Sequence, residues 1–202
     1  MRKLHLLLPL ALLALALGLV ACGGSSESDE DKVVDVIETS ALSTDPGDCK
    51  ELATQAFLEQ TELEQGSAAV KSCEESAEET EGDPESVDVS KVEVDGSAAT
   101  ADVAFTGGNF DGQTLSVALI EEDGDWKMDE ITGFAEFDQD KLADAFAEGL
   151  QSGEDALDPQ LATCFAEVIR EMPKPEAEEA IIGGSADPIV AIIEGCSEGL
   201  EQ

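Results

Sequence analysis

The fold is decided by the stretch VEVDGSAATADVAFTGGNFDGQTLSVALIEEDGDWKM, at residues 92–128. Apolar and polar residues alternate along it, as they do in strands that bury one face. Asp95-Gly96 and Asp123-Gly124 are typical two-residue hairpin turns, and the glycine-rich run at 107–112 predicts another turn between them. Together with the alternating residues just before position 92, the pattern predicts a meander of four antiparallel strands over residues 86–132.

Each predicted strand has an apolar face. In the first three strands these faces consist of Val87, Val89, Val92 and Val94; of Ala99, Ala101, Val103 and Phe105; and of Leu115, Val117 and Leu119. The alternation changes phase near Ser90-Lys91, which predicts a β-bulge. In the fourth strand, strict alternation places Trp126, Met128 and Glu130 on one face. Ile131 then falls on the opposite face.

Apolar residues at helical spacing lie on both sides of this strand region. Before it, the spacing predicts three helices within residues 32–80, with a break between the second and third at Gly66-Ser67. After it, residues 138–202 return to helices. Two of these begin at Asp158-Pro159 and Asp187-Pro188, where an Asp N-cap precedes a Pro at the first helical position.

Three helices followed by an antiparallel sheet with the hairpin sequence Gly124-Asp125-Trp126-Lys127 resemble the nuclear transport factor 2-like superfamily. The resemblance implies a cone-shaped α+β domain over residues 32–133, with three N-terminal helices packed on a curved four-stranded antiparallel sheet. A cystatin-like arrangement of helix on sheet is the alternative. Residues 134–202 then form a small helical domain of their own.

The first 22 residues differ from the rest of the chain. Arg2 and Lys3 precede an almost wholly apolar run that ends in the box Leu19-Val20-Ala21-Cys22. A basic start, an apolar run and a small residue at the cut are typical of a secretory signal peptide. With a cysteine directly after the small residue, the segment resembles the signal of bacterial lipoproteins.

The lipoprotein resemblance implies that residues 1–21 are removed and that Cys22 carries a diacylglycerol thioether. The protein would then be extracytoplasmic, anchored through the Cys22 lipid to the bacterial cell membrane (outer leaflet) or to the outer membrane. The alternative is a plain transmembrane anchor, because the apolar run is close to the lower limit of about 17 residues for spanning a bilayer. Residues 22–31 have no apolar side chain after Cys22 and predict a flexible tether.

Four further cysteines remain, an even number that suggests disulfides outside the cytoplasm. Of the three possible connectivities, Cys49–Cys73 with Cys164–Cys196 is favoured because each pair lies within one segment on either side of the strands. The second pair would staple the helical domain. Zinc binding and free thiols are the alternatives, but the chain has no CxxC spacing and its one histidine, His5, precedes Cys22.

Charge excludes several classes of function. The chain carries 47 Asp and Glu against 10 Lys and Arg, a formal net charge of −37. Such an excess of acid excludes most nucleic-acid binding, which needs clustered basic residues. With no histidine after His5, the chain lacks the usual base of nucleophilic catalysis, and it has no tyrosine to stabilise an enolate. The acidic runs do not match a calcium loop, so we expect neither a metal nor a cofactor.

The candidate pocket residues are Trp126, Met128 and Glu130, on the predicted inner face of the fourth strand. Trp126 is also a natural core residue, and Glu130 is a candidate lone catalytic base. Asp102 falls opposite Ala101 and Val103 and is expected to face solvent.

Three functions remain open at this point. The first is a non-catalytic envelope module that binds a small apolar ligand or an envelope protein. The second is a pocket enzyme of the isomerase or cyclase type that uses a lone carboxylate. The third is a purely structural acidic surface protein.

Overall fold

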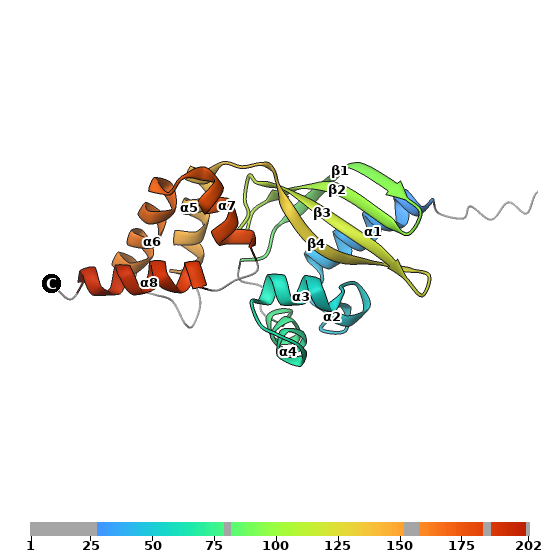
Figure 1. The fold of residues 1–202 in the computed structure, drawn as a ribbon, viewed down its shortest axis with the longest axis horizontal. Coiled ribbons are helices and arrows are strands. Elements are labelled where there is room, and N and C mark those ends of the chain that lie inside the picture. The colour runs from blue at the N-terminus through green and yellow to red at the C-terminus, as the bar shows by residue number, and fades with distance from the viewer. Residues whose placement is uncertain (1–27, 79–81, 152–157, 184–186, 201–202) are drawn as a thin grey trace, which may run out of the picture.

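The computed structural model describes residues 28–78, 82–151, 158–183 and 187–200. The predicted signal peptide and Cys22 lie outside these residues. Within the described ranges the chain is α+β: four helices precede a four-stranded antiparallel sheet and four helices follow it (Figure 1). At this level the predicted fold class is confirmed.

The predicted meander is also confirmed. Its strands pair in sequence order, each antiparallel to the next, and are β1 (Ser86–Asp95), β2 (Ala98–Thr106), β3 (Thr114–Glu122) and β4 (Asp125–Glu136). The β1–β2 register shifts between Ser90 and Glu93, and Lys91 there has a φ of 51°, so the predicted bulge is present. Strand β4 continues to Glu136, beyond the expected boundary at residue 133.

The first helix, α1 (Asp29–Leu42), begins before residue 32 because its N-terminus is well capped. The Ser28 hydroxyl accepts a hydrogen bond from the backbone N–H of Asp31, and the Asp31 carboxylate accepts one from the backbone N–H of Ser28. Three acids in the first turn also suit the positive end of the helix dipole. The prediction of a tether as far as residue 31 is therefore wrong for residues 29–31.

The second predicted helix is two helices, α2 (Asp48–Glu51) and α3 (Gln55–Glu62), so that α4 (Ser67–Ser76) is the fourth rather than the third. The break falls at Leu52–Thr54, which pairs with the free edge of β4. The backbone N–H of Thr54 donates to the Met128 carbonyl (2.8 Å), and the Met128 N–H donates to the Leu52 carbonyl (2.8 Å). A helix cannot continue through Leu52–Thr54, because the Leu52 carbonyl and the Thr54 N–H are hydrogen-bonded to β4 rather than to helical partners.

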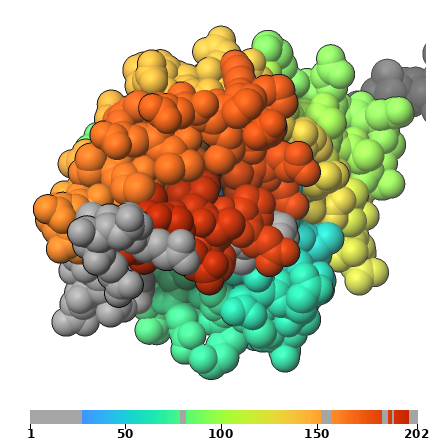
Figure 2. Space-filling view, turned by 60° about the vertical axis from the view of Figure 1, so that its left-hand side comes forward, coloured from blue at the N-terminus to red at the C-terminus, as the bar shows by residue number. Residues whose placement is uncertain are grey.

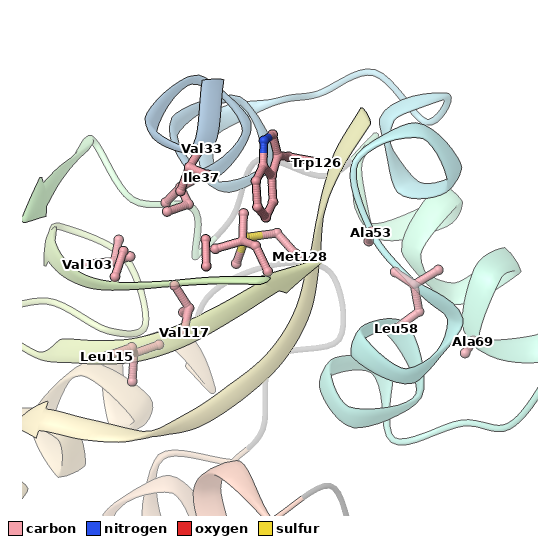
Figure 3. Packing of buried hydrophobic residues seen from close by; sticks show 13 residues of the cluster. Val33, Ile37, Ala53, Leu58, Ala69, Val103, Leu115, Val117, Trp126 and Met128 are labelled. Atoms are coloured by element: carbon pink, nitrogen blue, oxygen red, sulfur yellow. The ribbon is translucent and has the colours of Figure 1, made fainter. Parts of the chain in front are cut away.

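The main hydrophobic core lies between the N-terminal helices and one face of the sheet (Figure 3). Val33 and Ile37 of α1 and Leu58 of α3 pack there against the inward-facing side chains of the sheet, namely Val103, Leu115, Val117, Leu119, Trp126 and Met128. The alternation predicted for β2 and β3 is therefore confirmed, since the predicted residues are buried, with Phe105 partly so.

Strict alternation fails in β4. Its register with β3 shifts between the pairs Met128–Leu119 and Glu130–Ala118, so that Asp129 is an extra residue. The Asp129 carboxylate accepts a hydrogen bond from the Thr54 hydroxyl (2.9 Å). Beyond the bulge, Ile131 packs against the core and Glu130 is exposed, the reverse of the prediction.

The last four helices form a second core. They are α5 (Gln139–Gly149), α6 (Pro159–Glu171), α7 (Lys174–Ile182) and α8 (Asp187–Leu200). Phe165, Ile169 and Ile192 are buried among them, and the Cys164–Cys196 disulfide joins α6 to α8. Figure 1 shows the four helices together at one end of the molecule, and in Figure 2 α6–α8, in orange and red, lie on the face towards the viewer.

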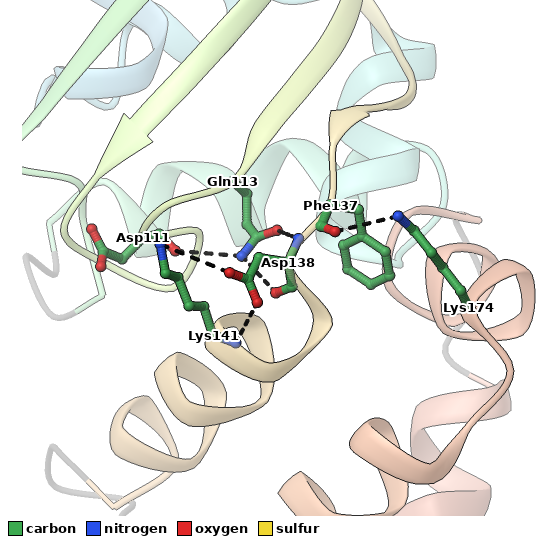
Figure 4. Close-up of polar contacts among 6 residues, drawn as sticks. All are labelled: Asp111, Gln113, Phe137, Asp138, Lys141 and Lys174. Carbon is green, nitrogen blue, oxygen red and sulfur yellow. Dashed lines mark hydrogen bonds and ion pairs between the residues drawn. The ribbon is translucent and has the colours of Figure 1, made fainter.

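The second core is docked on the sheet through a buried glutamine. The Gln113 amide donates to the Asp138 carbonyl (3.0 Å) and accepts from the Asp138 backbone N–H (2.9 Å), as Figure 4 shows. Nearby, the rings of Phe110 and Phe146 meet edge to face with centroids 6.3 Å apart. Lys174 lies over the Phe137 ring and donates to its carbonyl (3.3 Å).

Trp126 gives a first prediction about the core. Its indole Nε1 is buried and has no hydrogen-bond partner among the described residues, and in Figure 3 it lies at the end of the ring farther from Met128. Trp126→Phe removes this unsatisfied donor along with some apolar contact, so its unfolding free energy should stay within about 1 kcal/mol of the wild type. Trp126→Ala should lose about 3–5 kcal/mol.

Urea unfolding followed by far-UV circular dichroism measures both variants, because this signal does not depend on the replaced indole. A loss for Trp126→Phe well above about 1 kcal/mol would contradict an indole nitrogen without a partner.

Candidate functional site

A cavity of about 360 Å³ lies between the helices and the inner face of the sheet. Its sheet wall consists of Val103, Phe105, Leu115, Val117, Met128 and Ile131. Its helical wall includes Ile37 of α1 and Phe57 and Leu58 of α3. The volume lies within the range typical of small-molecule sites, and the walls are mainly apolar as such sites usually are.

Helix α3 is fixed against the sheet by Gln60. The side-chain amide of Gln60 donates to the Ile131 carbonyl (2.8 Å) and accepts from the Ile131 backbone N–H (2.8 Å), as a neighbouring strand would. It also donates to the Ile182 carbonyl at the end of α7 (2.9 Å). One side chain thus ties the helical wall of the cavity to both the sheet and the C-terminal helices.

The Cys49–Cys73 disulfide lines the same cavity and joins α2 to α4. The predicted pairing of all four cysteines is therefore confirmed. Because α2 is a single turn of helix, this covalent link and the backbone pairing at Leu52–Thr54 determine where it lies.

Carboxylates are the charged groups of the cavity lining in the described residues: Asp45, Asp48, Glu62 and Asp83. Burial raises the pKa of the Glu62 carboxyl, an effect that a hydrogen bond with Ser72 partly offsets. Burial also raises the pKa of Asp83, at the edge of the cavity. The Asp48 carboxylate accepts a hydrogen bond from the Ser43 hydroxyl, and the Asp45 carboxylate accepts one from the Gly47 backbone N–H (2.9 Å).

The predicted pocket residues are separated by the structure. Met128 lines the cavity. Trp126 is 3 % exposed and instead borders a second groove, which is lined by side chains of both signs, including Lys32, Lys50 and Lys127. The prediction that Glu130 faces the pocket is wrong: the bulge at Asp129 turns it outward, where it is exposed.

Asp102 faces away from the cavity, as expected, but it is not simply solvated. Its carboxylate accepts hydrogen bonds from Lys91 (2.7 Å) and the Ser116 hydroxyl (2.8 Å). The Lys91 ammonium is the main reason that the pKa of Asp102 lies below its usual range.

The cavity carboxylates were missed by the sequence analysis. Glu62 could have been found, because it follows Leu58 by four residues and so shares its face of α3. Asp83 had no such signal, since its place depends on how the chain passes from α4 to β1.

The polar side chains of the described lining are carboxylates and hydroxyls. Proton abstraction by a carboxylate needs a partner that stabilises the negative charge formed on the substrate. Among the described lining residues there is no Lys, Arg, His or Tyr to do so, only the hydroxyls of Ser40, Ser43, Thr61 and Ser76. In the same described part of the chain, no cluster of three or more His, Cys, Asp or Glu is arranged to hold a metal ion.

Comparisons with protein-family models, with curated proteins and with solved structures each find no match to this chain.

The two disulfides provide a matched pair of perturbations. Each closes a loop, of 24 residues for Cys49–Cys73 and 32 for Cys164–Cys196, so either Cys→Ser pair should lower the unfolding free energy by about 3–4 kcal/mol. Only the Cys49→Ser/Cys73→Ser pair should also change the cavity, because only that disulfide lines it.

Chemical denaturation measures the stability of both variants, and a neutral fluorescent probe such as N-phenyl-1-naphthylamine measures cavity binding. Equal loss of probe binding in the two variants would contradict a specific role for Cys49–Cys73 in shaping the cavity.

Proposed function

We propose that this protein is a lipid-anchored extracytoplasmic binding module of the bacterial envelope, without catalytic activity, that takes a small apolar ligand. The binding site is the cavity between the N-terminal helices and the sheet, in a nuclear transport factor 2-like arrangement of helices on a curved sheet. The observation that carries the proposal is the cavity itself, with its apolar walls and its volume of about 360 Å³.

The proposed compartment is supported by the cysteines and by the N-terminal sequence. Two disulfides are compatible with an oxidising environment outside the cytoplasm. The box Leu19-Val20-Ala21-Cys22 is the reason to propose a lipid on Cys22. Among the described residues, none of the helices has both the length and the apolar character that crossing a bilayer requires.

A neutral apolar probe tests the binding site. N-phenyl-1-naphthylamine should fluoresce on entering the cavity, and Val117→Phe, which fills the cavity from the sheet, should weaken probe binding at least tenfold. Ala118→Phe is the matched control, because Ala118 is the next residue of β3 and alternation turns it to the other face. Ala41→Phe fills the cavity from α1 and serves if overpacking at Val117 prevents folding.

Binding that is equal in the wild type, in Val117→Phe and in Ala41→Phe would overturn the cavity as the site. So would an absence of binding by the wild type to a panel of neutral apolar compounds. Fluorescence from probe that partitions into lipid or detergent is common to all variants, so it cancels when their signals are compared.

The lipid anchor is tested separately. In the bacterial host, a labelled fatty acid should be incorporated into the wild type and not into Cys22→Ala, because two or more acyl chains on Cys22 are the proposed anchor. Cell fractionation should show the wild type with membranes. Equal labelling of the two proteins would refute lipidation at Cys22.

A further inference from the structure

The charges around the cavity are all of one sign within the described residues. Asp45 and Asp48 come from the α1–α2 connection and the start of α2, Glu62 ends α3, and Asp83 lies between α4 and β1. The sheet wall contributes apolar side chains alone. A molecule in the cavity would therefore have apolar contacts on the sheet side and carboxylates on the helical side.

Within the described residues, these four carboxylates form no ion pair with a basic side chain. The ion pairs of the described structure use other acids, which are Asp29, Glu74, Glu75, Asp102, Glu122, Asp138 and Asp144. Asp45, Asp48 and Glu62 receive hydrogen bonds from nearby groups, but no Lys or Arg in the described residues pairs with them or with Asp83.

Glu62 has the least favourable surroundings for a negative charge. It is half-buried at the cavity wall, and this burial raises the pKa of its carboxyl. A positive charge placed nearby would offset the cost of keeping Glu62 ionised. Asp83 also lines the cavity but is exposed, so it would gain less than Glu62.

We propose that the ligand of this cavity is a cationic amphiphile, with an apolar body against the sheet and a protonated amine against Glu62 and Asp83. The inference rests on the proposed binding function and narrows its ligand. The charge of the whole chain, −37, acts in the same direction, because its field attracts small cations and repels anionic amphiphiles such as fatty acids.

A series of ligands that differ only in the head group tests the proposal. Decylamine, 1-decanol and decanoate share one apolar chain and are compared at pH 7 by displacement of N-phenyl-1-naphthylamine, below their aggregation concentrations. Decylamine should bind at least about fivefold more tightly than 1-decanol, and decanoate more weakly than 1-decanol.

Variants of the cavity acids separate a local effect from the general field. In Glu62→Gln/Asp83→Asn the ratio of decylamine affinity to 1-decanol affinity should fall below about twofold. The control is Glu64→Gln/Asp88→Asn, which removes the same two charges from exposed residues that do not line the cavity. It should keep the preference for the amine.

The outcomes distinguish this inference from the function on which it rests. Equal binding of decylamine and 1-decanol, or tighter binding of decanoate, overturns the cationic ligand and leaves the apolar site standing. An amine preference that falls equally in both double variants also overturns it, because the general field would then be the cause. Failure of all three compounds to displace the probe from a wild type that binds it also overturns the cationic amphiphile, whereas the apolar site itself is overturned only by the probe and cavity-filling variants described above.

Discussion

The position of the N-terminal helices depends on a short backbone pairing between residues 52–54 and Met128 in β4. This contact ends α2, begins α3 and occupies the free edge of β4, which would otherwise present unpaired backbone groups. Thr54 adds a side-chain bond to Asp129, the extra residue of the β4 bulge. This contact thus places α3 in the helical wall of the cavity, and the bulge at Asp129 turns Ile131 towards the cavity.

Two glutamine side chains also form hydrogen bonds with backbone groups at other junctions of the molecule. Gln60 pairs with the backbone of Ile131 further along the β4 edge, and Gln113 pairs with the backbone of Asp138 where the chain leaves the sheet. Each amide supplies one donor and one acceptor to backbone groups that would lack partners at a buried junction. Two small cores are therefore joined by directional bonds, and the Phe110–Phe146 contact adds an apolar part.

Features of the fold could be predicted from the sequence where they depend on residues that are close together in the chain. The strands and the β1 bulge were predictable, since period-two burial and turn residues are local signals. The start of α1 also depends on a local signal, the capping box of Ser28 and Asp31. That signal lies in an acidic run that was interpreted as part of the tether. The split between α2 and α3 and the outward turn of Glu130 both follow from long-range contacts with β4, which no local pattern contains.

The same contacts explain how a cavity persists in so small a core. Several residues buried between helices and sheet are small, including Ala53, Ala69 and Ala101, so large side chains do not fill the space between the layers. Unfilled apolar space costs stability, and the self-repulsion of a chain with net charge −37 adds to that cost. The hydrogen bonds of Thr54 hold the start of α3 to β4, and the Cys49–Cys73 disulfide holds α2 to α4. A ligand that filled the apolar space and carried positive charge would relieve both costs at once.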